Sequence, residues 1–208
     1  MPKVERYREP EELSEKLSGL KKGHVRALGV DLGNNCGVAY CDFDPRKPID
    51  WDKIQMVGGQ LDLKVAPYET GPLRHVRLKH FLFVLSPSII GFEDVKNTPS
   101  EAMYGGKKLG IIVARIANAA ELLGGLKITM TTWAEEQGVP AVSWSISEIK
   151  KWATGKGNAG KPAMIKAANK KFRVELDPEN FQTSGTDNIA DAMHACAMTV
   201  ETYAKGLK

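Results

Sequence analysis

The chain has 208 residues, of which 42% are hydrophobic and 26% are charged, and its formal net charge at pH 7 is +4. These proportions are typical of a folded globular protein and exclude a chain that is disordered as a whole. The three cysteines, Cys36, Cys41 and Cys196, form no CxxC pair. This spacing argues against a disulfide framework and a thiolate zinc site, and it favours a reducing compartment.

No segment reads as membrane-spanning or secretory. The longest apolar stretch, residues 109–126, is interrupted by Arg115, Asn118 and Glu121. Residues 1–17 mix acids with bases and have no apolar centre, unlike a signal peptide. We therefore expect a cytoplasmic protein without a membrane partner.

Residues 1–23 are charged and predict a peripheral N-terminal extension, with one short helix over residues 11–20. Three β-rich segments follow at residues 24–33, 36–43 and 53–63. Short turns join them, so they predict an antiparallel meander.

Helical and strand-like segments alternate in the rest of the chain. In order, we expect a helix over 73–86, a buried strand over 88–95, a long helix through 109–123 capped by Ser100, a strand over 141–146, short basic helices over 147–155 and 161–172, and a last helix over 186–206. This order predicts an α/β fold with a five-stranded mixed sheet flanked by helices, as one domain over residues 24–208.

Four acids lie where apolar segments end or where the last helix begins: Asp31, Glu93, Asp187 and Asp191. The last two are four residues apart and share a helical face. Converging carboxylates favour a hard cation such as Mg²⁺, and two such ions can activate a water and stabilise the leaving oxygen in phosphodiester hydrolysis. Acids at element ends also fit caps and turns, and we expect Asp94 to be structural because it alternates to the other face of its strand.

Four segments together resemble the RuvC-type Holliday-junction resolvases of the ribonuclease H-like superfamily. They are ALGVDLGNNCGVAY, SIIGFEDV, EIKKWATGKGNAGKPAMI and DNIADAMHACAM. The resemblance covers residues 26–199 and implies a ribonuclease H-like fold. Its divergent form resembles bacteriophage versions, which implies work in a bacterial or phage-infected host cytosol.

The resemblance assigns catalytic, metal-binding carboxylates to Asp31, Glu93 and Asp191. A fourth acidic position of the family falls on Asn188, and the nearest acid is Asp187. We favour Asp187 as the fourth ligand, because a neutral amide would weaken binding of a divalent ion. The implied cofactor is a pair of Mg²⁺ ions in each active site, with Mn²⁺ as a substitute.

Residues 148–173 contain eight basic residues and one acidic residue. Such a segment suits a DNA backbone, although a solvated helical face has the same composition. The resemblance matches two family lysines to Lys150 and Lys161, with Lys161 also catalytic. We expect four lysines of this segment to bind DNA: Lys150, Lys151, Lys156 and Lys161.

The long helix, with Gly105, Gly106 and Gly110, resembles the dimer-forming helix of the family. A homodimer would set two active sites on opposing strands of a four-way junction. Tyr104 suits either base stacking or packing, and His194 suits either metal binding or, more simply, helix packing.

The sequence thus predicts a Mg²⁺-dependent DNA endonuclease that resolves Holliday junctions by paired symmetric nicks, leaving 5′-phosphate and 3′-hydroxyl ends. Its expected partner is branched DNA, chiefly four-way junctions. Three alternatives stay open: a broader flap and Y-junction debranching nuclease, a junction-binding protein without catalysis, and a phosphotransfer enzyme, since glycine-flanked Asp motifs also cradle nucleotides.

Overall fold

A computed structural model describes residues 5–7, 17, 19–94 and 109–206. The short helix expected over 11–20 falls almost entirely outside these residues. The same holds for Ser100, Tyr104, Gly105 and Gly106.

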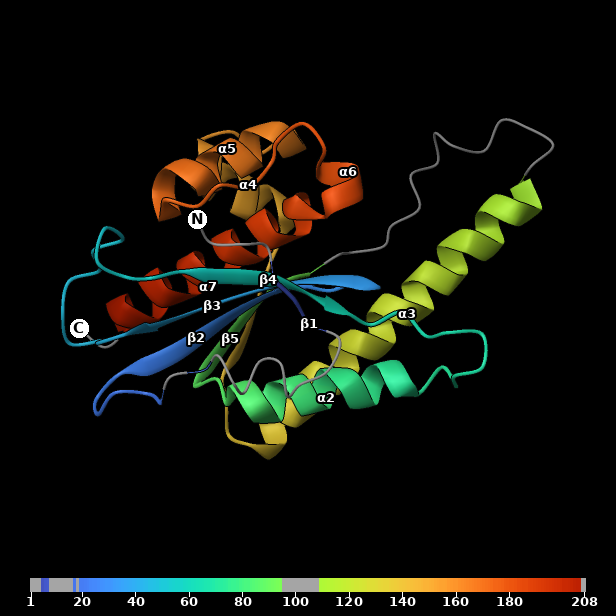
Figure 1. Cartoon of the computed structure of the whole chain (residues 1–208), viewed down its shortest axis with the longest axis horizontal. Helices are drawn as coiled ribbons and strands as arrows, with labels where there is room; N and C mark the ends of the chain where they lie inside the picture. Colours follow the sequence, from blue (N-terminus) through green and yellow to red (C-terminus); the bar gives the residue numbers. More distant parts are fainter. Residues whose placement is uncertain (1–4, 8–16, 18, 95–108, 207–208) are drawn as a thin grey trace.

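A mixed sheet forms the centre of the molecule, with strand order β1-β4-β3-β2-β5-β6 (Figure 1). Its strands are β1 (Glu5–Tyr7), β2 (Val25–Asp31), β3 (Asn35–Phe43), β4 (Val57–Asp62), β5 (Ile89–Glu93) and β6 (Ala141–Trp144). The last five are the predicted strands, and the α/β fold class is confirmed.

The predicted antiparallel meander is present, and the structure adds the directions of the later strands. Strands β2, β3 and β4 form the antiparallel meander, while β5 pairs parallel to β2 and β6 parallel to β5. The three-residue β1 pairs parallel to β4 and adds a sixth strand at the edge. It comes from the segment that the sequence assigns to a peripheral extension.

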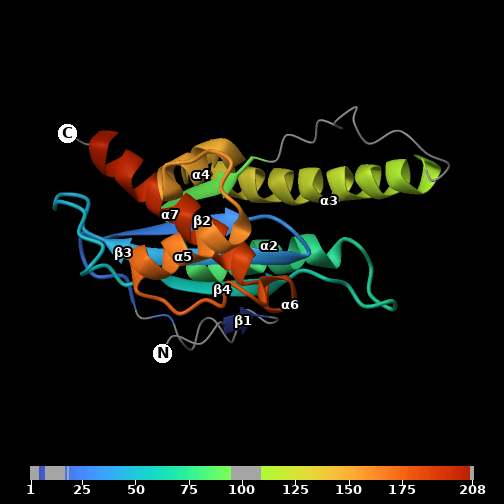
Figure 2. The ribbon, with the colours of Figure 1, turned by 90° about the horizontal axis from the view of Figure 1, so that it is seen from above.

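Helices cover both faces of the sheet (Figures 1 and 2). On one face lie α2 (Leu73–Leu85) and α3 (Leu109–Glu136), and the N-terminal end of α3 extends well beyond the sheet. The other face carries α7 (Thr186–Gly206), over which lie α4 (Ile146–Thr154), α5 (Lys161–Phe172) and α6 (Phe181–Ser184). In the part of the chain that the structure describes, no helix combines the length and apolar character needed to cross a bilayer.

The basic helices α4 and α5 begin and end as their sequences require. Ser145 and Glu148 form a capping box at the start of α4, and Gly155 ends that helix in the left-handed conformation with φ of 78°. Pro162 occupies the first turn of α5, where its missing N–H costs no hydrogen bond. The turn between the two helices is therefore short and well defined.

Alternation along the strands divides the core into two layers. Leu28 and Val30 of β2 pack in the cluster that contains α2 and α3 side chains, whereas Ala27 packs in the cluster that contains α7. Gly29 also faces α7, because a Cβ there would overlap the carbonyl oxygen of Ala192. Residues of odd number in β2 therefore point toward α7.

Helix α7 lies directly on the backbone of the sheet. A Cβ at Gly91 of β5 would overlap the hydroxyl of Thr199, just as one at Gly29 would overlap α7. Glycine is required at both positions because there is no room for a side chain, and not because the backbone conformation is unusual. The close approach fixes α7 over the central strands.

Candidate active site

Strand register places Asp31 and Glu93 together. Val30 of β2 pairs with Phe92 of β5 in the parallel ladder, and the following residue in each strand is an acid that ends the strand. Asp31 has the same parity as Gly29, and Glu93 the same parity as Gly91, so both carboxylates lie on the α7 side of the sheet.

Helix α7 supplies two more acids to this edge. Asp187 lies in its first turn and Asp191 one turn later. Asp187 is 6% exposed, and Asp191 is half-buried, like Asp31 and Glu93. Acids from β2, β5 and α7 therefore converge, although they are up to 160 positions apart in the chain (191 − 31).

The electrostatics confirm that the four acids share one region. Burial, followed by the charges of Glu93, Asp191 and Asp187, raises the pKa of Asp31 well above its ordinary value. Burial, Glu93 and Asp187 raise the pKa of Asp191 to about 7. Burial also raises the pKa of Glu93. Burial is thus the largest influence on all three carboxyls, and repulsion between neighbouring acids adds to it for Asp31 and Asp191.

Two lysines from the basic helices face this cluster. Lys161, the first residue of α5, donates a hydrogen bond from its ammonium to Asp187. Lys150 of α4 acts with Lys161 to oppose the raised pKa of Glu93 and of Asp191. The two lysines that the family resemblance selects are thus the ones that lie near the carboxylates.

Three neighbouring polar residues point elsewhere. The amide of Asn188 donates to the backbone oxygen of Asn35, 2.8 Å away, at the start of β3. Asp94 pairs with Lys127 of α3 at 2.7 Å, on the opposite face of the sheet from α7, so its predicted structural role fits. His194 is fully buried, and its Nε2 lies 3.0 Å from the carbonyl oxygen of Met164, which fits helix packing.

The basic segment is not uniform in its surroundings. Lys151 and Lys156 are exposed, the first near the end of α4 and the second in the turn that follows. Lys171 instead donates to Glu201 at 3.3 Å, and Arg173 pairs with Asp52 at 2.7 Å. Lys151 and Lys156 are therefore open to a polyanion, whereas Lys171 is engaged within the protein.

The partners of Glu201 hold the basic helices on α7, and no pattern in the sequence indicates that they meet at this carboxylate. Its carboxylate accepts hydrogen bonds from the indoles of Trp51 at 3.0 Å and Trp152 at 3.1 Å. Burial tends to raise the pKa of Glu201. The hydrogen bond from Trp51, with the charge of Lys171 and the hydrogen bond from Trp152, outweighs burial, so the pKa is lowered overall. Trp51 lies 150 positions from Glu201 in the chain, so no local pattern could reveal this cluster.

The acidic cluster fits a hard divalent cation in donor type and in charge. Four carboxylates supply the oxygen ligands that Mg²⁺ and Mn²⁺ prefer, and the raised pKa values of Asp31 and Asp191 show negative charge that a cation would offset. As the described side chains stand, however, no three His, Cys, Asp or Glu residues among them are gathered tightly enough to hold an ion. Binding would therefore require the carboxylates to close together.

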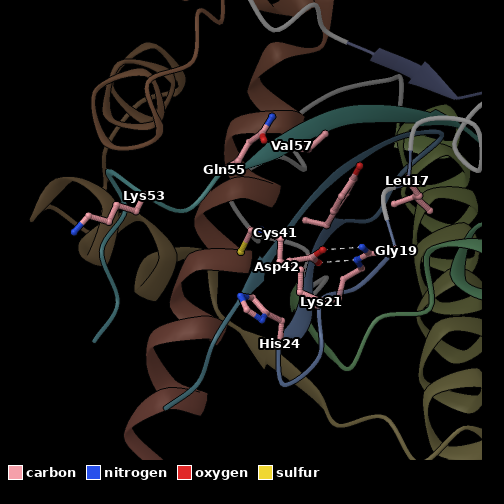
Figure 3. Close-up of a pocket in the computed structure, with 11 residues that line it drawn as sticks. Leu17, Gly19, Lys21, His24, Cys41, Asp42, Lys53, Gln55 and Val57 are labelled. Atoms are coloured by element: carbon pink, nitrogen blue, oxygen red, sulfur yellow. Dashed lines mark hydrogen bonds and ion pairs between the residues drawn. The ribbon is translucent and has the colours of Figure 1, made fainter. Parts of the chain in front are cut away.

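A separate hollow lies at the opposite end of β2 (Figure 3). Its volume is about 370 Å³, and Lys21, Tyr40 and Lys53 are among the residues that line it. Arg26 makes two hydrogen bonds of 2.7 Å to Asp42 there, drawn as dashed lines in Figure 3. None of the predicted site residues lines this hollow, so the carboxylate edge is the candidate active site.

Solved structures with a similar fold include RuvC and a mitochondrial Holliday junction resolvase. Thermus thermophilus RuvC has a TM-score of 0.56 and 17% identity, and the match covers 88% of this chain and 96% of that one. The T. thermophilus RuvC in complex with Holliday junction substrate has a TM-score of 0.58 and 19% identity, over 86% and 98%. The yeast mitochondrial Holliday junction resolvase Ydc2 has a TM-score of 0.52 and 16% identity, over 94% and 87%.

No protein-family model matches this sequence, and none of the curated proteins is significantly similar to it. The similarity is thus one of three-dimensional structure, at identities below 20%, and it extends over most of each chain. This likeness shows that the chain has a RuvC-like fold.

Proposed function

We propose that this chain is a metal-dependent endonuclease that resolves Holliday junctions by paired symmetric nicks. The observation that carries the proposal is the convergence of four carboxylates and two lysines at one edge of a RuvC-like fold. One of the similar structures is a complex with Holliday junction substrate, which supports branched DNA as the partner.

The carboxylates of Asp31, Glu93, Asp187 and Asp191 would hold two Mg²⁺ ions, or Mn²⁺ in their place. The chemistry that such ions supply when bound is activation of a water and stabilisation of charge on the leaving 3′ oxygen. Asp187 is a better fourth ligand than Asn188, because it lies buried beside Lys161 while the Asn188 amide is bound to Asn35.

The basic helices would place the substrate. Lys150 and Lys161 face the carboxylates, so they would hold the scissile phosphate and offset its charge. Lys151 and Lys156 are exposed, near the end of α4 and in the turn that follows, and would contact the neighbouring DNA backbone. Contacts of this kind position DNA without reading its sequence.

Paired nicks on opposing strands call for two active sites related by a two-fold axis, so we propose that the protein acts as a homodimer. The N-terminal end of α3 extends beyond the sheet, and we propose that the two copies associate there (Figure 2). The oligomeric state is measurable by sedimentation with and without junction DNA.

The decisive experiment incubates the protein with labelled four-way, Y-shaped and linear DNA, with and without Mg²⁺. Paired symmetric nicks in the four-way substrate alone are expected. Equal cutting of the four-way and Y-shaped substrates would point to general debranching. Tight binding without nicking under any metal condition would instead identify a non-catalytic junction-binding protein and refute the proposal.

The matched variants for this assay are Asp31→Asn and Asp62→Asn. Asp31 belongs to the carboxylate cluster, whereas Asp62 ends β4 and accepts a backbone hydrogen bond from Lys64. Asp31→Asn should abolish cleavage and retain junction binding, and Asp62→Asn should cleave normally. Normal cleavage by Asp31→Asn would remove that residue from the mechanism.

A further inference from the structure

The ion pair between Lys161 and Asp187 joins a largely exposed side chain to a buried one. The Lys161 side chain is 55% exposed, whereas that of Asp187 is 7% exposed and lies at the base of α7. The ammonium of Lys161 also lies 5.8 Å from the centre of the Phe181 ring in α6. The lysine thus reaches inward from solvent, past an aromatic neighbour, to a buried carboxylate.

The charge of Lys161 acts on the whole acidic cluster. It opposes the raised pKa of Asp31, of Glu93 and of Asp191, in addition to its hydrogen bond with Asp187. In return, although burial lowers the pKa of Lys161, the hydrogen bond to Asp187 and the charges of Asp191 and Asp31 raise it overall. One ammonium therefore serves as a counter-ion for the four carboxylates.

A divalent cation bound by these carboxylates would meet that ammonium as a like charge. The metal ion and the ammonium would repel each other in this partly buried cluster, and both would bind the carboxylate of Asp187. The described carboxylates are also not gathered tightly enough to hold an ion while Asp187 is paired with Lys161.

We propose that Lys161 is a built-in competitor of the divalent cation at Asp187, so that cation binding displaces its ammonium and frees it for a DNA phosphate. The inference rests on the proposed metal site and adds the order of events there. Because linkage is reciprocal, a phosphate that binds Lys161 and draws it away from Asp187 strengthens cation binding. The factor equals that by which the bound cation strengthens phosphate binding.

The test measures binding of Mn²⁺ to the full chain without DNA, by electron paramagnetic resonance of the free ion. The variants are Lys161→Gln, which removes the charge and keeps a long polar side chain, and Lys161→Ala. Lys166→Ala is the matched control, since Lys166 is an exposed lysine of the same helix that has no role in the proposed site. Both Lys161 variants should bind Mn²⁺ at least about fivefold more tightly than wild type, and the control should not differ.

A second readout follows the freed ammonium. Junction affinity is measured against salt in EDTA and in Ca²⁺, which occupies oxygen sites. The wild-type salt slope should steepen by about one in Ca²⁺, because one more lysine then contacts phosphate. The Lys161→Gln slope should be the same in both conditions, and circular dichroism of each variant reports that it is folded.

The outcomes separate the inference from the proposed function. Wild-type protein that binds Mn²⁺, with folded Lys161 variants that bind it equally or more weakly, overturns the competition and leaves the metal site intact. Failure of all folded variants and the wild type to bind Mn²⁺ overturns the metal site itself, and the inference with it.

Discussion

The ammonium of Lys171 lies 3.7 Å from the centre of the Trp152 ring. The same ammonium donates to Glu201, which also accepts the indole hydrogen bonds of Trp51 and Trp152. Four segments of the chain meet at this point: the loop before β4, α4, α5 and α7. Part of the positive charge of residues 148–173 therefore fastens the basic helices to the domain instead of facing solvent.

Lys171→Ala should destabilise the protein by about 1 kcal/mol through the lost cation–π contact and hydrogen bond. Its effect on the salt dependence of DNA binding should be small. Lys166→Ala, an exposed lysine of the same helix, should leave stability unchanged. Urea unfolding and fluorescence anisotropy measure the two properties. A Lys171→Ala protein of full stability would contradict the role assigned to this contact.

Adjacent acids on opposite faces of β5 provide a second prediction. Glu93 faces the carboxylate cluster, whereas Asp94 pairs with Lys127 of α3. Glu93→Gln should lower Mg²⁺-dependent cleavage by about a hundredfold or more, because the site loses an anionic ligand. Asp94→Asn should lower stability slightly and keep cleavage within about threefold. Equal rates for the two variants, measured in single-turnover assays, would exclude Glu93 from the active site.

The close contact between α7 and the sheet predicts an unequal response of two glycines. In Gly29→Ala the new Cβ would overlap the backbone oxygen of Ala192, so we expect a loss of about 3 kcal/mol or more in unfolding free energy. Gly124→Ala, in α3, meets no atom within 4 Å and should stabilise the helix by about 0.5–1 kcal/mol. Urea denaturation measures both, and a tolerated Gly29→Ala would contradict the packing described for α7.

The carboxylate cluster should make the metal-free protein less stable as pH rises. The pKa of Asp191 is about 7 in the folded protein, whereas its ordinary value, which applies to the unfolded chain, is 3.8. Between these two pH values the folded state therefore binds more protons than the unfolded state. Unfolding free energy in EDTA should therefore decline from a pH of about 4 to about 7 and then level off.

Asp191→Asn should flatten that decline, while Asp94→Asn should keep it. Mg²⁺ should restore stability most strongly near the upper end of this pH range, where the carboxylates are charged. Thermal unfolding in buffers across the range measures the effect. Stability that rises with pH over the same interval in EDTA would contradict the electrostatic description of the cluster.

Sequence patterns sufficed for most of the fold, because its main strands and helices are long enough to show periodicity. The β-rich segments that form β2 and β3 and the small-residue helix α7 are examples. β1 and α6 were missed, since three or four residues carry no period. The predicted segment 53–63 was too long at its start, where residues 51–54 form turns tied down by contacts such as the Trp51 indole bond.

The candidate site was predictable only as far as motifs reach. Motif order singled out Asp31, Glu93 and Asp191, and the structure brings their charges together. Asp187 and Asn188 could not be separated by pattern, because neighbouring helical residues differ by about 100° in direction and only tertiary contacts decide which faces the site. The assignment of these residues as ligands stays a prediction.

No side chain separates α7 from the strands at Gly29 and Gly91, so the helix packs directly on the backbone of the sheet and cannot shift along it without a clash. The backbones that carry its acids and those of the strands are therefore fixed relative to one another, and only their side chains can close together around a cation. Under the proposed function, adjustment to a branched substrate would come from the α4–α5 pair, which is held on α7 through polar and aromatic contacts at Trp152. The carboxylates would then keep their places while the helices that carry the lysines adapt to the DNA.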